Sequence, residues 1–213
     1  MNRAVIISNG TVDDYTFFKS KISHDDFIIC ADGAIRHLLK IGIMPDLWIG
    51  DFDSCKFDQL CIDYPSLKQV QIKKLNPCKD ETDTHICAIE AINKGYNDIL
   101  ILGGIGNRVD HMLGSVSLLE WLYENNVNAY IENEKNIITV VGNKTIIKKE
   151  RDYISLIALD KEVFIKSFTG VKYPLDNFIL KRGLTIGISN EILLNKANID
   201  ISYGRVLIIQ SDD

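Results

Sequence analysis

Asp46-Leu47-Trp48-Ile49-Gly50-Asp51-Phe52-Asp53-Ser54 is the stretch from which the fold of this chain follows. A short apolar run ends at a glycine, and two aspartates come directly after it. This pattern is typical of a buried strand that runs into a polar loop. In an extended loop, residues i and i+2 point to the same side, so Asp51 and Asp53 would both face one cation. Without a counter-ion, two carboxylates about 4 Å apart repel by roughly 4 kcal/mol at an effective dielectric of about 20. The alternative is an ordinary solvated turn, in which Asp, Ser and Gly are common.

Apolar runs and helical patterns alternate on both sides of this stretch, over residues 1–134. The apolar runs predict strands at 4–7, 27–31, 47–49, 70–72, 99–102 and 127–131. Helical spacing predicts helices at 13–20, 34–40, 82–94 and 108–125. In the last helix one apolar face is expected from Val109, Met112, Leu113, Val116, Leu119 and Tyr123. Continuous apolar strands separated by helices indicate a parallel sheet covered on both faces, which is a doubly wound α/β domain.

The pattern changes after about residue 135. Short strands are predicted at 137–141, 145–148, 153–159, 162–168, 184–188, 199–202 and 206–209, with tight-turn signals between them. This region is typical of an antiparallel β domain. The predicted fold class is therefore α/β: an N-terminal doubly wound parallel-sheet domain over 1–134, then a C-terminal antiparallel β-sandwich or barrel-like domain over 135–213.

The composition excludes several classes of protein. The chain has 213 residues, is 46% hydrophobic and 25% charged, and carries a net charge of −5. Its scattered positive charge argues against nucleic-acid binding. Its five cysteines form no CxxC pair, which favours reduced thiols. The N-terminal apolar run is too short for a signal peptide, and no apolar run approaches the ~18 residues of a membrane helix. We therefore expect a cytoplasmic protein without membrane contact.

Acidic residues recur where the predicted strands end. Asp32 follows the second strand, Asp51 and Asp53 the third, Asp80 and Asp83 the fourth, and Asp110 the fifth. Doubly wound sheets bind ligands beyond the carboxyl ends of their strands, so four loops would bring these carboxylates to one edge. Local alternatives exist for most of them. Asp32 fits a turn, and Asp80, Asp83 and Asp110 fit the starts of helices, where negative charge is favourable.

Basic residues and glycines accompany these acids. Lys79 lies beside Asp80, and Arg108 lies beside Asp110. Carboxylates bind Mg²⁺, while Lys, Arg and helix N-terminal amides bind phosphate oxygens. Gly103, Gly104 and Gly106 permit close backbone approach to such a ligand, or else simply form tight turns.

Other common site patterns are missing. There is no GxxxxGK[ST], residues 104–109 lack the last glycine of GxGxxG, and no zinc-type Cys/His spacing or nucleophile elbow is present. His24 and His37 are expected at the surface. Trp48 and Trp121 are expected in the core.

Four ordered segments resemble the motifs of the thiamine pyrophosphokinase (thiamine diphosphokinase) family. They are Ala31-Asp32-Gly33, Gly50-Asp51-Phe52-Asp53-Ser54, Lys79-Asp80-Glu81-Thr82-Asp83 and Gly103-Gly104-Ile105-Gly106-Asn107-Arg108-Val109-Asp110-His111. Gly170-Val171-Lys172-Tyr173-Pro174-Leu175 and Gly187-Ile188-Ser189-Asn190-Glu191 are similar to later signatures of that family. The resemblance implies an enzyme that transfers pyrophosphate from ATP to thiamine and releases thiamine diphosphate and AMP.

The resemblance also implies roles for single residues. Asp51, Asp53 and Asp80 would bind Mg²⁺, with Asp32 nearby. Lys79, Asp83, Gly104, Arg108 and Asp110 would belong to the ATP site, with Asp53, Asp83, Arg108 and Asp110 as catalytic residues. The chain would form a homodimer, with thiamine between the N-terminal domain of one chain and the C-terminal domain of the other. Ser189 and Asn190 would contact thiamine there.

Two positions depart from the family pattern: His85 stands where the family often has Glu, and Ser115 where it often has Asn. Two other functions remain open at this point. One is a small-molecule kinase that moves a single phosphoryl group and releases ADP. The other is a non-catalytic module that binds a nucleotide or thiamine.

Overall fold

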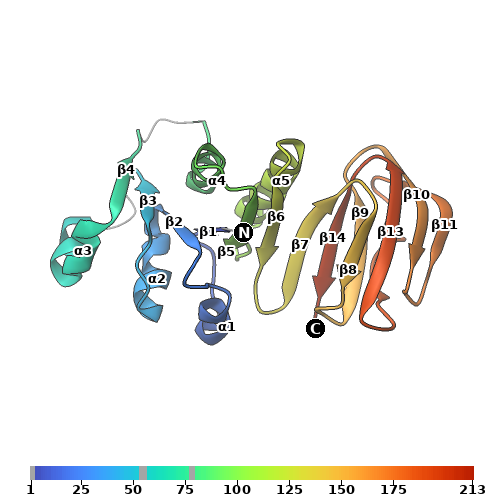
Figure 1. Cartoon of the computed structure of the whole chain (residues 1–213), viewed down its shortest axis with the longest axis horizontal. Coiled ribbons are helices and arrows are strands. Elements are labelled where there is room, and N and C mark those ends of the chain that lie inside the picture. The colour runs from blue at the N-terminus through green and yellow to red at the C-terminus, as the bar shows by residue number, and fades with distance from the viewer. Residues whose placement is uncertain (1–2, 53–56, 77–79) are drawn as a thin grey trace. The chain divides into compact units, whose positions relative to one another are not determined.

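The computed structural model describes residues 3–52, 57–76 and 80–213 (Figure 1). The chain divides into two compact units, residues 1–134 and residues 135–213. No helix among the described residues is long and apolar enough to cross a membrane.

The described strands of the first unit form a parallel sheet in the order β4-β3-β2-β1-β5-β6. They are β1 (Ala4–Ile7), β2 (Phe27–Ala31), β3 (Leu47–Gly50), β4 (Gln71–Lys74), β5 (Asp98–Leu102) and β6 (Asn128–Glu132). Strand β1 pairs in parallel with both β2 and β5. The strand order therefore reverses between β1 and β5, and such a switch point is where doubly wound sheets bind ligands.

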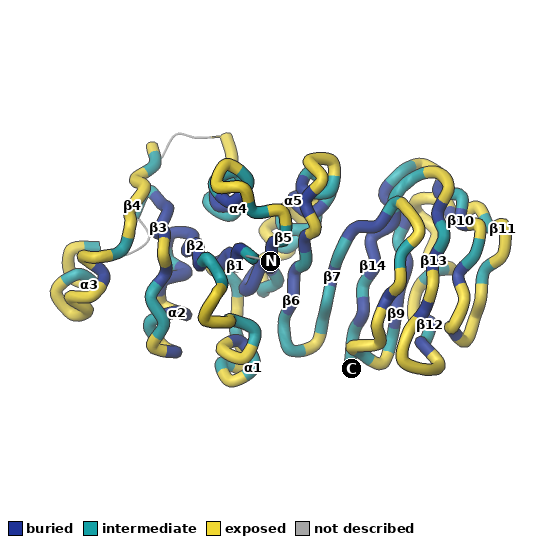
Figure 2. The backbone as a smooth tube through the Cα atoms, viewed as in Figure 1, coloured by how far each residue is buried: buried dark blue, intermediate teal, exposed yellow. Residues whose placement is uncertain are grey.

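Helices cover both faces of this sheet. The described helices are α1 (Tyr15–Ser20), α2 (Ile35–Ile41), α3 (Phe57–Asp63), α4 (Asp83–Asn93) and α5 (Val109–Glu124), with 3-10 turns at Asp32–Ala34 and Pro65–Gln69. Side chains from one face of the sheet, including Val5, Ile7 and Trp48, share a buried cluster with Phe18 of α1 and Leu38 of α2. Helix α4 packs on β1, β2 and β3. Strands β1 and β3 are buried throughout and β2 is buried from Ile28 onward, while the outer sides of the helices are exposed (Figure 2).

The predicted α/β fold is confirmed, with two local corrections. Helix α3 and the 3-10 turn after it were not predicted. The continuous apolar face expected for α5 is wrong in its first half, because Val109 and Leu113 are 62% and 57% exposed. Its buried residues are Leu118, Leu119 and Leu122, so only the C-terminal half of α5 packs on the core.

The second unit is an antiparallel β-sandwich, as predicted. One sheet has the order β12-β9-β14-β7 and the other β11-β10-β13-β8. The strands are β7 (Asn136–Val141), β8 (Thr145–Lys148), β9 (Tyr153–Ala158), β10 (Glu162–Thr169), β11 (Leu175–Lys181), β12 (Asn190–Glu191), β13 (Lys196–Tyr203) and β14 (Val206–Ser211). Ile154, Leu156 and Ile208 of one sheet share a core with Ile165 and Phe168 of the other.

One predicted strand of this unit is wrong. Residues 184–188 form turns, with Leu184, Ile186 and Ile188 57%, 66% and 45% exposed. Gly183 has a φ of +88°, which breaks an extended chain at the start of the segment. The strand lies earlier, at β11, where it pairs with β10. Its exposed polar residues weaken the hydrophobic alternation that predicts a strand.

Candidate active site

Asp32 joins the carboxyl ends of β2 and β3. Asp32 is only 8% exposed, and its Oδ1 accepts a hydrogen bond from the backbone N–H of Phe52 at 3.1 Å. Its backbone oxygen accepts a second bond, from the indole N–H of Trp48 at 2.8 Å. A Cβ on Gly50 would lie 2.6 Å from Asp32 Oδ1, so only glycine fits there. The Asp32 carboxylate thus fixes the turn that carries Asp51.

The chain is not extended at Phe52, directly after β3, where an extended loop was expected. Phe52 has a φ of +63°, in the left-handed region. Its ring packs edge-on against Trp48, with centroids 4.9 Å apart, and also contacts Phe57. This aromatic contact fixes the turn directly after the half-buried Asp51. Asp53 lies outside the described residues.

The loops after β1 and β5 pack against each other at the switch point. The N–H of Ser8 donates to the carbonyl of Leu102 at 2.8 Å, and the N–H of Gly10 donates to the carbonyl of Gly103 at 2.9 Å. A Cβ on Gly103, whose φ is +71°, would lie 2.3 Å from the Ser8 oxygen, and one on Gly10 would lie 2.3 Å from the Gly103 oxygen. Tight packing within the chain therefore requires these glycines.

Gly104 has a different environment. It is buried, and a Cβ there would lie 3.1 Å from methyl groups of Ile101 and Ile131. The absence of a side chain at Gly104 therefore lets the backbone pack closely against core residues.

The start of α4 lies beside the loop after β1. The Thr82 side chain caps α4 by accepting from the N–H of His85 at 3.2 Å. The hydroxyls of Thr84 and Ser8 are 2.9 Å apart and hydrogen-bonded. Asp83 is the first residue of the helix and is half-buried, while Asp80 is exposed. Lys79 lies outside the described residues.

Arg108 and Asp110 form a two-pronged ion pair at the start of α5. Arg108 Nε lies 3.2 Å from Asp110 Oδ1, and Nη2 lies 2.6 Å from Oδ2. Their side chains are 70% and 66% exposed. The hydrogen bond between them raises the pKa of Arg108 and lowers the pKa of Asp110, so both are charged near neutral pH. Because exposed ion pairs contribute little to stability, Arg108 is available to an anionic ligand.

Ser189 and Asn190 lie in the second unit, next to the turns at 184–188. Asn190 is buried, and its side chain clamps the backbone of Tyr173: Nδ2 donates to the Tyr173 oxygen at 2.8 Å, and Oδ1 accepts from the Tyr173 N–H at 3.0 Å. Ser189 is exposed, with a φ of +58°, and its N–H donates to the Ser155 hydroxyl at 3.1 Å. Asn190 thus fixes the loop that presents Tyr173, whose side chain is exposed.

Comparison with known proteins identifies the family to which both units of the chain are similar. Residues 18–131 match the description "Thiamin pyrophosphokinase, catalytic domain", and residues 143–208 match "Thiamin pyrophosphokinase, vitamin B1 binding domain". The chain belongs to the thiamin pyrophosphokinase family. It is 31% identical over 186 residues to the thiamine pyrophosphokinase of Bacillus subtilis, a match that covers 83% of each chain.

Solved structures of the thiamin pyrophosphokinase family share the fold. The crystal structure of the Bacillus subtilis protein has a TM-score of 0.90 at 26% identity and covers 100% of both chains. That of the Geobacillus thermodenitrificans protein has a TM-score of 0.86 at 27% identity and covers 100% of this chain and 98% of the other. These matches confirm the predicted family and fold class and identify the chain as a thiamine diphosphokinase. The roles of single residues remain predictions.

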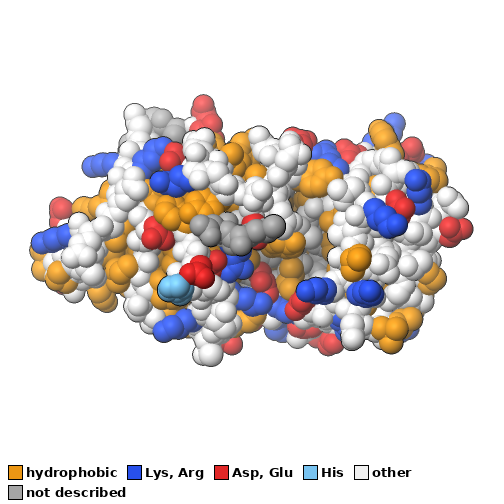
Figure 3. Space-filling view, in the orientation of Figure 1, with side chains coloured by type: hydrophobic (Ala, Val, Ile, Leu, Met, Phe, Trp, Pro, Cys, Tyr) orange, Lys and Arg blue, Asp and Glu red, His pale blue; other side chains and the backbone are white. Residues whose placement is uncertain are grey.

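No three His, Cys, Asp or Glu side chains among the described residues lie close enough together to bind a metal ion. The predicted set of Asp51, Asp53 and Asp80 is not covered by that finding, because Asp53 lies outside the described ranges. On the face shown in Figure 3, both basic and acidic side chains are scattered over the surface.

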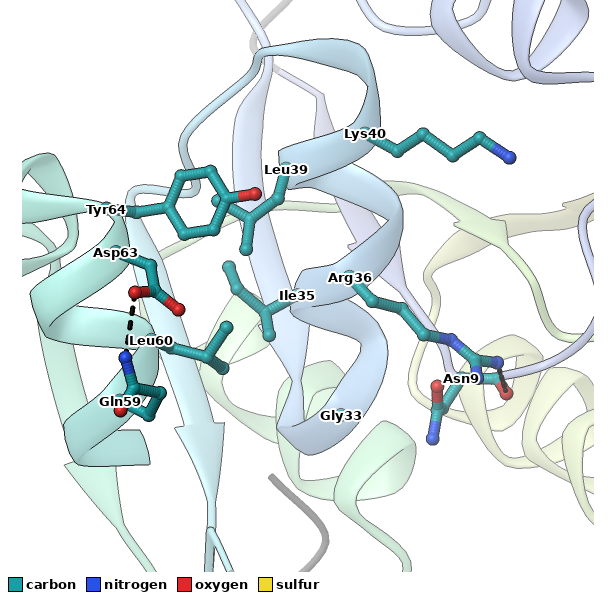
Figure 4. A pocket seen from close by; sticks show the side chains of 10 residues that line it. All are labelled: Asn9, Gly33, Ile35, Arg36, Leu39, Lys40, Gln59, Leu60, Asp63 and Tyr64. Carbon is teal, nitrogen blue, oxygen red and sulfur yellow. Dashed lines mark hydrogen bonds between the residues drawn. The ribbon is translucent and has the colours of Figure 1, made fainter. Parts of the chain in front are cut away.

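Two features of this thiamin pyrophosphokinase chain were missed by the sequence patterns. One is a cavity of about 670 Å³ between α2 and α3, which Ile35, Leu39 and Leu60 line with apolar side chains (Figure 4). The other is His37, which was expected at the surface but is only 2% exposed. His37 lies three residues after Ala34 and four before Ile41, both buried, so the helical spacing contained that signal.

Proposed function

We propose that this chain transfers the pyrophosphoryl group of ATP to the hydroxyl of thiamine in a Mg²⁺-dependent reaction, with thiamine diphosphate and AMP as products. One observation carries the proposal. In a chain of the thiamin pyrophosphokinase family, Asp32, Asp51 and the Arg108–Asp110 pair all follow strands of one parallel sheet. They lie at the carboxyl ends of β2, β3 and β5, on either side of the switch point.

The reaction is a displacement at phosphorus. The thiamine hydroxyl oxygen forms a bond to the β-phosphorus of ATP, and the bond from that phosphorus to the oxygen bridging to the α-phosphate breaks. AMP leaves with the bridging oxygen and its electron pair, and the hydroxyl proton passes to solvent or to a carboxylate. Such reactions depend mainly on in-line positioning and on neutralising the phosphate charge.

The described residues support both requirements. Arg108 offers a planar guanidinium that binds phosphate oxygens in a two-pronged manner, as it already binds Asp110. Asp83 and Asp110 lie in the first turns of α4 and α5, where they would orient the nucleotide or the attacking hydroxyl. Lys79 is proposed as a second cation for the phosphates.

Mg²⁺ fits the carboxylates proposed for it. Asp51, Asp80 and Asp53 offer hard oxygen donors, which are the ligands that Mg²⁺ prefers. The turn held by Asp32 gives Asp51 a defined place at the end of β3. When bound, Mg²⁺ would neutralise charge on the phosphate chain.

We further propose that the second unit binds thiamine and that the chain acts as a homodimer, with thiamine between the two chains. Ile186 and Ile188, which precede Ser189 in the sequence, and Tyr173, whose backbone Asn190 binds, all have exposed apolar side chains. Clustered exposed apolar residues are typical of interaction surfaces. Sedimentation analysis at micromolar protein tests this part, because a monomer would contradict it.

The test of the main proposal is product analysis after incubation with ATP, Mg²⁺ and thiamine. We expect thiamine diphosphate and AMP in equal amounts, and no product without Mg²⁺. Thiamine monophosphate with ADP would show single phosphoryl transfer. Binding of thiamine or ATP without turnover would identify a binding module.

A further inference from the structure

We propose that His37 is a positioning residue for the ATP site: it holds the loop after β1 and, through it, the glycine loop that leads to Arg108. This inference rests on the proposed function, because it assigns a role in that reaction. His37 lies on α2, and its ring is hydrogen-bonded to Tyr15 and Gly10, neither of which is proposed to bind Mg²⁺ or ATP. The role assigned to it acts through the backbone that it fixes.

Two short hydrogen bonds hold the His37 ring, and the guanidinium Nε of Arg36 lies 3.4 Å from its Nε2. Its Nε2 lies 3.0 Å from the backbone oxygen of Gly10, and its Nδ1 lies 2.7 Å from the hydroxyl of Tyr15. Since a carbonyl oxygen only accepts, the shorter contact to Gly10 assigns the proton to Nε2; Nδ1 then accepts from the Tyr15 hydroxyl, and Nε2 does not accept from Arg36. A neutral imidazole with one defined tautomer thus bridges α1 and the loop after β1.

The surroundings of His37 keep it neutral. The rings of Tyr15 and Phe18 lie 5.8 and 5.9 Å from it. The charged side chains nearest to it are both cationic: Arg36 is adjacent on α2, and Lys40 lies 3.8 Å over the centre of the Tyr15 ring. Burial is the largest cause that lowers the pKa of His37, to about 4, and the two cations add to it. A buried neutral ring that donates to one carbonyl acts as a structural clamp.

The clamp closes on a loop that is already tightly packed. Gly10, whose oxygen His37 binds, donates its N–H to Gly103 at 2.9 Å. Gly106 packs on the same loop, since a Cβ there would lie 3.0 Å from the N–H of Thr11. Two residues after Gly106 the chain reaches Arg108. A displacement of Gly10 would therefore also displace residues 103–106, which lead to Arg108.

Arg36, the residue before His37, also binds this loop. Its Nη2 donates to the backbone oxygen of Asn9 at 3.1 Å, a contact drawn in Figure 4. Two neighbouring side chains of α2 thus bind two successive carbonyls, at 9 and 10. This double attachment distinguishes the loop after β1 from a free surface turn.

The test compares His37→Leu, which removes both hydrogen bonds, with His37→Gln, which keeps a donor and an acceptor. We expect His37→Leu to raise the KM for ATP about 10-fold to 100-fold, in the range seen when residues that orient a site are removed. The KM for thiamine should stay within about twofold, and His37→Gln should recover most of the loss. The exposed His24, changed to Gln, serves as the matched control and should leave both KM values unchanged.

Hydrogen exchange provides a readout independent of turnover. Amides at 8–10 and 103–106 should exchange faster in His37→Leu than in the parent, whereas β9 and β14 should be unaffected. A lower folded fraction with unchanged KM values and no local change in exchange would reduce His37 to a core residue and overturn the proposal. If the parent protein makes no AMP, the proposed function fails, while the exchange experiment still decides whether His37 fixes the loop.

Discussion

The corner, formed by Asp32, Gly50 and the turn at Asp51 and Phe52, lies at the carboxyl ends of β2 and β3. The corner and the start of α5 both carry acids proposed for one site, yet they are built differently. At the corner, Asp32 is 8% exposed and hydrogen-bonded to the backbone of Phe52. At the start of α5, Arg108 and Asp110 are mostly exposed and bind each other. The fold itself fixes the first group, whereas a ligand can displace the pairing of the second. Changes to Asp32 or Gly50, which build the corner, should affect stability as well as activity, and changes to Arg108 or Asp110 should affect activity alone.

The largest effect is expected at Asp51, which the corner positions for Mg²⁺. Asp51→Asn keeps the shape but removes the charge, and we expect turnover to fall by about 100-fold or more, as when a charge-stabilising group is lost. Asp53→Asn is expected to do the same. The melting temperature should change little. Asp58→Asn, on the exposed face of α3, is the control. Near-normal turnover of Asp51→Asn at saturating Mg²⁺ would refute the metal assignment.

Glycine substitutions compare the two regions by stability. Gly50→Ala places a Cβ 2.6 Å from the Asp32 carboxylate, and such overpacking costs about 1–3 kcal/mol. Gly114→Ala, on α5, meets no atom within 4 Å and should stabilise the helix by up to about 1 kcal/mol. Urea unfolding measures both. Equal changes in the free energy of unfolding for the two variants would contradict the claim that the corner is tightly packed and the exposed side of α5 is not.

Arg108→Gln isolates the exposed pair. Because the ion pair is open to solvent, its loss should leave the unfolding midpoint unchanged. The KM for ATP should rise by about 10-fold, since a charged hydrogen bond to phosphate is lost. Arg36→Gln is not a suitable control, because Arg36 binds the loop after β1. Lys68→Gln, in an exposed turn, is a suitable one. A falling midpoint for Arg108→Gln would place Arg108 among the structural residues.

The smallest effect expected is a pH dependence of stability from His37. Its pKa is about 4 in the folded chain, against an ordinary value of 6.5. The unfolded chain therefore binds more protons between these values, and stability falls as the pH falls from about 6.5 to about 4. His37→Gln should flatten this part of the curve. An unchanged slope in that variant would assign the loss to other groups.

The sequence predicted the first unit well because its strands are short, apolar and followed by glycine and aspartate. Asp32 and Asp51 lie at strand ends, as the pattern indicated. It did not predict the left-handed Phe52, since that conformation depends on packing against Trp48 and Phe57. It left open whether Gly103 serves ligand approach or a tight turn, and the close approach of Ser8 to Gly103 favours the turn.

The second unit was harder to predict in detail. An edge strand such as β11 buries little, so its pattern is weak, and the apolar segment 184–188 imitates a strand although it forms turns. The clamp by Asn190 on Tyr173 depends on a contact between residues 17 positions apart, which no local pattern encodes. Likewise, Tyr15 and Gly10 contact His37 from distant positions in the sequence.

The most direct test of the central claim uses ATP labelled with ³²P at the β-phosphate, incubated with the protein, Mg²⁺ and thiamine. Pyrophosphoryl transfer predicts that the label moves to thiamine diphosphate and that the released nucleotide is unlabelled AMP. Label that stays with the nucleotide as ADP, while thiamine gains a single phosphate, would contradict the account.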